Sequence, residues 1–170
     1  MPTIGELLNS KYNKAFKDAT LSASNTTASV ILFRVTGTVQ ITQLYGVVTT
    51  VLSSNITAAH WRSNDQTATV DISASAGTTL SSFAVGSQLT RHSVNTVALK
   101  GDNASAAKVI DPVAATAASI HMPFQVVQKT GAVQTDIEFV YTTTNTPATG
   151  VIRFFCEWQP LSDGATLVAV

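Results

Sequence analysis

The sequence predicts an all-β protein, a β-sandwich or jelly roll, that carries a short amphipathic helical arm at its N-terminus. Three observations predict this class. Thr and Ser supply 41 of the 170 residues and Val another 19, and the β-branched Thr and Val fit the pleated surface of a sheet. Short apolar or alternating segments recur between Gly, Asn and Asp breaks. Apolar residues at helical spacing occur in residues 3–18. We therefore divide the chain into an arm and linker, 1–29, and a β-sandwich domain, 30–170.

The arm is the first element in order. Its apolar residues recur at steps of three and four, and Thr3 and Glu6 match a capping box. Three lysines fall in its second half, where positive charge favours a helix C-terminus. The arm can pack on its own domain or dock on a neighbouring subunit, and the second alternative makes it a partner-contact arm. Its contact residues are then Ile4, Leu7, Leu8, Tyr12, Phe16, Lys11, Lys14 and Lys17.

The strands follow a linker of small hydroxyl residues, 19–29. The predicted strands cover 30–35, 39–52 (one long strand or a strand pair bent at Gly46), 55–62, 67–73, 89–100, 119–129, 134–144 and 149–159, with further short pieces around Gly77 and Gly86. The Ala-rich stretch 104–118 contains Asp111-Pro112, which disfavours a continuous helix and indicates an irregular crossing. The turn 146–150 predicts a hairpin between the last two strands. In the last strand Ile152, Phe154, Cys156 and Trp158 share one face.

Low charge limits the function classes. The net charge is zero and 12% of the residues are charged, about half the usual share. This composition excludes a highly basic nucleic-acid binder, an acidic solvating tail, a disulfide scaffold and a coiled coil. No run of 18 apolar residues predicts a membrane span, and polar residues directly after Leu8 argue against a cleaved leader. A nearly uncharged surface has little self-repulsion, and open sandwich edges need cover. Together these features favour a ring-like homo-oligomer.

Reaction chemistry has little support in the sequence. His60, His92 and His121 lie on separate predicted strands without metal-ligand spacing. Cys156 is expected to be a buried, unreactive thiol. Asp136, Glu138 and Glu157 can be paired for glycoside hydrolysis in principle, but their alternation with apolar residues predicts the solvent face of a hairpin. Elbow, dinucleotide and phosphate-loop motifs do not occur. We expect no enzyme, no cofactor and no metal.

A resemblance gives the expected function. The segments Val39–Leu52, His60–Val70, Gly77–Ser87 and Thr142–Phe155 resemble small virion-associated proteins of tailed bacteriophages, over residues 30–160. The resemblance implies a β-rich, often trimeric particle component such as a capsid decoration or cement protein. Such proteins act by surface contact, so it implies no catalytic or cofactor residue.

The expectation is therefore a homotrimeric decoration protein that stabilises the phage head. Its partners are copies of itself and the major capsid protein or other virion subunits, with no nucleic acid or membrane partner. It would lie in the virion after assembly in the host cytoplasm. Two alternatives stay open. One is a tail, neck or baseplate component, and the other is a glycan- or receptor-binding module with an exposed aromatic patch around Trp61.

Overall fold

The structure is a computed structural model that describes residues 13–91, 94–105, 123–130, 134–144 and 146–170. Within these ranges the chain forms β-strands and no helix. The strands are β1 (Asn13–Thr20), β2 (Thr27–Thr36), β3 (Thr38–Thr50), β4 (Ile56–Asn64), β5 (Thr69–Asp71), β6 (Gln88–Thr90), β7 (Lys100–Asp102), β8 (Phe124–Val127), β9 (Thr135–Thr143), β10 (Val151–Pro160) and β11 (Thr166–Ala169). The all-β prediction is confirmed.

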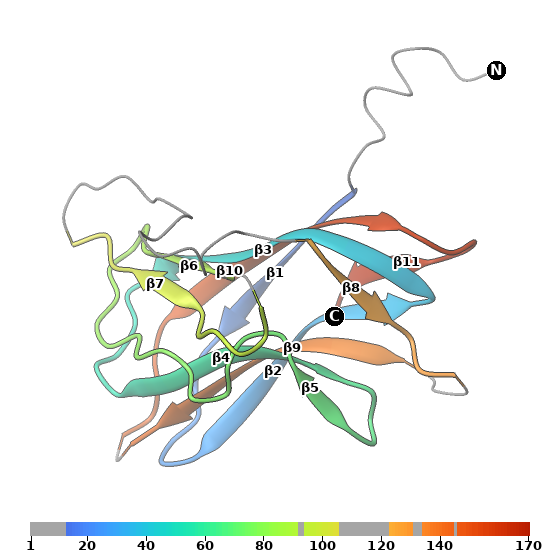
Figure 1. The fold of residues 1–170 in the computed structure, drawn as a ribbon. Coiled ribbons are helices and arrows are strands. Elements are labelled where there is room, and N and C mark those ends of the chain that lie inside the picture. The colour runs from blue at the N-terminus through green and yellow to red at the C-terminus, as the bar shows by residue number, and fades with distance from the viewer. Residues whose placement is uncertain (1–12, 92–93, 106–122, 131–133, 145) are drawn as a thin grey trace, which may run out of the picture.

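The strands make two antiparallel sheets. The first has the order β1-β10-β3-β6-β7, with β8 also paired to β3, and the second has the order β11-β2-β9-β4-β5. Figure 1 shows them as two layers, with β3 and β8 in the upper layer and β4, β5 and β9 in the lower one. This arrangement is compatible with the predicted sandwich.

Aromatic side chains join the two layers. Phe154 of β10 lies 4.8 Å from Phe139 of β9 and 6.2 Å from Trp61 of β4, measured between ring centroids. All three side chains are fully buried. Because β10 belongs to one sheet and β4 and β9 to the other, these contacts place the core between the sheets.

Strand pairing is nested along the chain. β1 pairs with β10, β2 with β9, β3 with β8 and β4 with β5. The chain thus resembles one long hairpin folded over so that alternate pairs fall into opposite sheets. Strands near the two ends of the described chain thus lie side by side in both sheets: β1 pairs with β10, and β2 also pairs with β11, outside the nested order.

The predicted helix is wrong where the structure describes it. Residues 13–20 form β1, which pairs without a register shift along β10. The burial pattern alternates: Lys14, Phe16 and Asp18 are exposed, whereas Ala19 is buried and Lys17 is half-buried. The strand β10 provides backbone hydrogen-bond partners for alternate residues of β1, and this tertiary pairing overrides the local helical spacing. Residues Ile4, Leu7, Leu8, Lys11 and Tyr12 lie outside the described residues.

Two strand predictions also need correction. The expected hairpin between 134–144 and 149–159 does not form, because β9 and β10 lie in different sheets. The expected long strand 89–100 is replaced by the three-residue strands β6 and β7, which pair with each other. Of the two alternatives for residues 39–52, the single long strand is confirmed, because β3 continues through Gly46 in its pairing with β10.

The predicted linker 19–29 is held to the second sheet. The hydroxyl of Tyr141 accepts backbone N–H bonds from Ser22 and Ala23 at 3.2 and 3.3 Å. The backbone N–H of Ala148 donates to Ala23 O at 2.7 Å. The segment is therefore anchored, and its ends belong to β1 and β2.

Candidate interaction surface

The outward side of β1, β10 and β3 carries a row of aromatic side chains. In the strand register Phe155 stands opposite Phe16 on one side and Tyr45 on the other. The Phe155 ring stacks on Tyr45 at 4.9 Å and lies 6.4 Å from Phe16. Phe16 is 61% exposed, which is unusual for a Phe in a folded domain. We call this surface the β1 face; it comprises Lys14, Phe16, Asp18, Tyr45, Arg153, Phe155 and Glu157.

Ion pairs flank the aromatic row on both sides. Arg153 binds Asp18 through two bonds of 2.7 and 2.8 Å, and Lys14 lies 2.8 Å from Glu157. The hydrogen bond from Arg153 lowers the pKa of Asp18, and the hydrogen bond to Glu157 raises the pKa of Lys14. Both shifts favour the charged forms of Lys14 and Asp18, and both residues belong to the outer strand β1.

Alternation along β10 explains why the row exists. Ile152, Phe154, Cys156 and Trp158 are buried, so Arg153, Phe155 and Glu157 point the other way. Across from Phe154 stands Gly46, where an added Cβ would come within 3.0 Å of the Phe154 ring. The glycine makes room for the ring on the core side. Phe155 is thereby held on the outer side.

The sequence identified part of this surface. Lys14 and Phe16 were predicted contact residues and do lie on the β1 face, whereas Lys17 points to the other side of β1. Tyr45, Asp18, Arg153 and Phe155 were not predicted. The alternation noted in 151–158 was the available signal, because four core residues on one face leave Phe155 on the opposite one.

The outer side of the second sheet holds two buried carboxylates. Asp136 is fully buried and Glu138 is 3% exposed, so their predicted solvent exposure on a hairpin is wrong. Arg34 binds Asp136 at 2.9 Å, and Arg62 binds Glu138 at 2.7 Å. Long side chains of the neighbouring strands β2 and β4 cover the carboxylates. The alternation of polar and apolar residues along one strand cannot predict this cover, because it comes from other strands.

Amide groups complete the shells of both carboxylates. Asn64 donates to Glu138 at 2.9 Å, while Gln66 and Gln134 donate to Asp136 at 3.1 and 3.2 Å. Each carboxylate oxygen thus accepts a hydrogen bond. Glu157 lies on the other sheet, paired with Lys14. The structure therefore does not bring the three acidic residues together.

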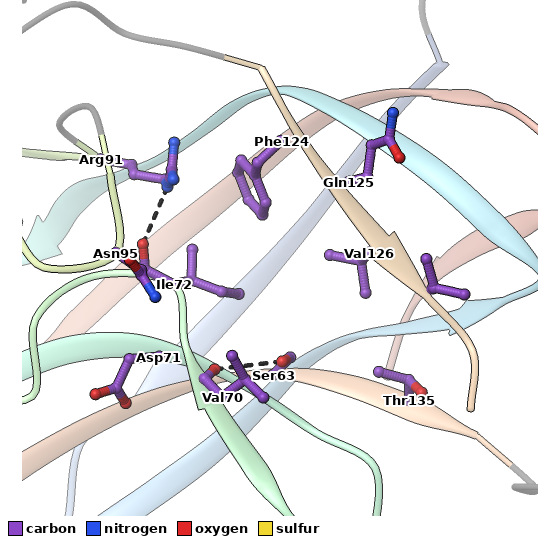
Figure 2. A pocket seen from close by; sticks show the side chains of 11 residues that line it. Ser63, Val70, Asp71, Ile72, Arg91, Asn95, Phe124, Gln125, Val126 and Thr135 are labelled. Carbon is purple, nitrogen blue, oxygen red and sulfur yellow. Dashed lines mark hydrogen bonds between the residues drawn. The ribbon is translucent and has the colours of Figure 1, made fainter.

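A pocket of about 270 Å³ lies between β8 of the first sheet and β5 of the second. Figure 2 shows Phe124 and Val126 of β8 on one side and Val70 and Ile72 on the other, whereas the side chain of Gln125 lies on the opposite side of β8. The remaining lining residues are Ser63, Asp71, Arg91, Asn95, Val127 and Thr135. The pocket mixes apolar walls with amide, hydroxyl and charged groups, a combination that suits a small polar ligand.

Arg91 is the most constrained of these groups. It is 6% exposed, its Nε donates to Ile72 O at 3.0 Å, and its guanidinium lies 4.2 Å from the centre of the Phe124 ring. Burial lowers the pKa of Arg91. A buried guanidinium stacked on an aromatic ring stiffens this wall of the pocket.

Other predicted residues lie in structural positions. Trp61 is wholly buried, so it cannot belong to an exposed aromatic patch. His60 is 8% exposed with Nδ1 3.0 Å from Ala58 O, whereas His92 and His121 lie outside the described residues. Cys156 is buried, as predicted, and burial raises the pKa of its thiol. Among the residues that the structure describes, no group of three or more His, Cys, Asp or Glu has a metal-binding arrangement.

Comparison with known proteins adds no relative: no family model, no curated protein and no solved structure matches the chain. Within the described ranges, no helix has the length and apolarity to cross a bilayer. Fold and surface together define a two-sheet β-protein whose outermost strand presents an exposed aromatic and charged face.

Proposed function

We propose that the protein is a non-enzymatic structural component of a bacteriophage particle, a capsid decoration protein that stabilises the head through subunit contacts. The nested strand order supports classing the fold as a jelly roll, an architecture used by capsid proteins. The sequence resemblance given above points to the same class. The observation that carries the proposal is the β1 face, because an exposed aromatic row on an outer strand has the composition of a contact surface.

The partners follow from this role. Copies of the chain, three in the expected ring, and the major capsid protein or another virion subunit would cover the exposed surfaces. The apolar residues Ile4, Leu7, Leu8 and Tyr12, next to β1 in the chain, are proposed to reach the neighbouring subunit. Many identical contacts on one particle add avidity even when each contact is weak.

Particle composition tests this function. Purified particles of the phage that encodes the chain are expected to contain it in a fixed ratio to the major capsid protein, measured by quantitative mass spectrometry. A reconstruction by electron microscopy is expected to place it on the outer head surface. Absence from washed particles refutes a virion role, and a position on the tail, neck or baseplate selects that alternative.

The arm is tested on the full-length protein. Leu7→Asp with Leu8→Asp is expected to reduce occupancy of stripped particles, because charged residues oppose burial in a contact. Asp163→Asn, an exposed change in a turn far along the chain, serves as the control. Equal occupancy of the particles by both variants would refute a role of the arm in binding to the neighbouring subunit.

The pocket supports one second candidate, a module that binds a sugar residue of a host glycan. Phe124 and the amide residue Asn95 line it, and such a mixture of aromatic and amide groups suits a polyhydroxylated ligand. A glycan array with the wild type and Asn95→Ala tests this function. Wild-type binding that the variant loses supports it, and an array without signal refutes it.

A further inference from the structure

The free backbone edge of β1 is the starting point. Among the described residues β1 pairs only with β10, and it ends the order of its sheet. The N–H of Leu21 donates to Gly150 O at 3.0 Å, and the β1–β10 register runs on from this pair without a shift. Hydrogen-bonded pairs alternate along an antiparallel ladder. Residues 19, 17 and 15 therefore bond to β10, whereas the backbone groups of 14, 16 and 18 point to the free edge.

The same three positions carry the exposed side chains of β1. Lys14, Phe16 and Asp18 lie on the β1 face, with a cation before the aromatic ring and an anion after it. This order becomes complementary to itself when a second copy runs antiparallel. A twofold axis at Phe16 sets Phe16 opposite Phe16 of the partner subunit and Lys14 opposite Asp18 of the partner subunit.

Other twofold registers are worse. An axis at Lys14, Lys17 or Asp18 sets that residue opposite its own copy, and like charges directly opposite each other destabilise a strand pair. An axis at Ala15 sets Lys14 opposite the aromatic ring and leaves both charges without a cross-strand partner. In the Phe16 register Lys17 stands opposite Ala15 of the partner subunit, a small residue that leaves it room.

We propose that two copies of this chain associate through β1, antiparallel and in the Phe16 register. The pairing joins the first sheets of both copies into one continuous sheet. Its outer side then carries an aromatic row that runs from Tyr45 through Phe155 and Phe16 into the same three residues of the second copy. Rows of alternating charge, Glu157, Lys14, Asp18 and Arg153, lie on either side of it. An isologous contact of this kind is the commonest form of self-association.

This inference rests on the self-association in the proposed function, but it concerns a twofold contact. In an assembly with threefold symmetry the β1 contact would join one trimer to the next. The inference therefore predicts which surface meets its own copy, independently of where in a particle the protein lies.

Cysteine cross-linking tests the register. The twofold places the two copies of residue 16 about 5.5 Å apart between Cα atoms, which is within the range of a disulfide. Full-length Phe16→Cys is expected to form a covalent dimer under mild oxidation. In Lys14→Cys the two introduced thiols stand four residues apart along the strands, about 14 Å, so this matched variant is expected to stay uncross-linked. The buried Cys156 does not compete.

Charge exchange provides a second test that keeps Phe16. Lys14→Asp and Asp18→Lys each place like charges across the proposed interface, and each alone is expected to weaken association roughly tenfold. An equimolar mixture restores both opposite-charge pairs, because the first variant carries an anion at both positions and the second carries a cation at both. At a protein concentration too low for either variant alone to dimerise, sedimentation of the mixture is therefore expected to show mixed dimers.

Either failure overturns the inference. A Phe16→Cys protein that stays monomeric on oxidation, or cross-links no better than Lys14→Cys, excludes this register. A mixture of charge variants that associates no better than its components excludes the charge pairing. Neither result affects the virion role, which particle composition decides separately. Conversely, cross-linking of a protein that is absent from particles keeps the twofold and removes the proposed function.

Discussion

Phe154 and Phe155 are neighbours in the chain with opposite surroundings, and replacing each by Ala tests the arrangement of the sheets. Phe154 is fully buried between the layers and contacts the rings of Trp61 and Phe139. Removing a buried Phe costs about 3–5 kcal/mol of unfolding free energy, because the apolar contact is lost and a cavity remains. For a domain of this size that loss corresponds to roughly 6–20 °C in Tm.

Phe155→Ala is the matched control. Its ring lies on the β1 face, where a cross-strand aromatic contact contributes about 1 kcal/mol. Urea unfolding followed by tryptophan fluorescence, at a protein concentration low enough to exclude association, measures both variants. We expect Phe154→Ala to shift the midpoint several times further than Phe155→Ala at an unchanged m-value. Equal shifts would refute the assignment of the two faces and with it the packing of β10.

Three further results are expected. Gly77→Ala is expected to lower the unfolding free energy in urea by about 3 kcal/mol, since Gly77 has φ +67° and an added Cβ would lie 2.2 Å from the Ala58 carbonyl carbon. Its control, Gly164→Ala, has φ +71° but open space around the added Cβ, and is expected to cost about 1 kcal/mol. Similar losses in the two variants would contradict the close approach of Gly77 to Ala58. Asp65 has a pKa below its usual value because Thr67 and the backbone hydrogen-bond its carboxylate. The ionised carboxylate therefore contributes to the free energy of unfolding at pH 6, and this contribution is lost as the pH falls below about 3.9. Asp65→Asn is expected to reduce the difference in urea midpoint between pH 6 and pH 3. Cys156 is expected to react with a thiol reagent only when urea unfolds the protein, and rapid labelling of the native state would contradict its burial.

Composition and strand periodicity predicted most of the fold. β2, β3, β4, β9 and β10 fall within a few residues of their predicted ranges, because buried strands keep their alternation in the sequence. Composition and periodicity did not predict which of these strands pair with each other. Thr146–Gly150 has the composition of a hairpin turn, but the same residues carry the chain from one sheet to the other. Turn residues report a change of direction, whereas the choice of sheet depends on partners more than 100 positions away.

The N-terminal error has a different cause. The segment 13–18 is short and partly polar, and its pattern fits both the helical period of 3.6 and the strand period of two. The spacing of the apolar residues that precede it therefore favoured a helix. The pairing with β10 makes this segment a strand, which the local sequence pattern does not indicate. The same register places Phe16 on the outer side, next to Phe155. The β1 face was therefore only half visible in the sequence: Lys14 and Phe16 were identified, while Arg153 and Tyr45 depend on strand neighbours.

The nested pairing has a consequence for synthesis on the ribosome. Asp18 and its partner Arg153 are 135 positions apart, and β10 is the strand that lies between β1 and β3 in the first sheet. Until β10 has left the exit tunnel, β1 and β3 have no strand between them. Contacts of such long sequence separation slow folding and leave strand edges exposed to other nascent chains. Chains that terminate early therefore lack the centre of a whole sheet, and we expect them to aggregate or to be degraded rather than to persist as partly folded protein.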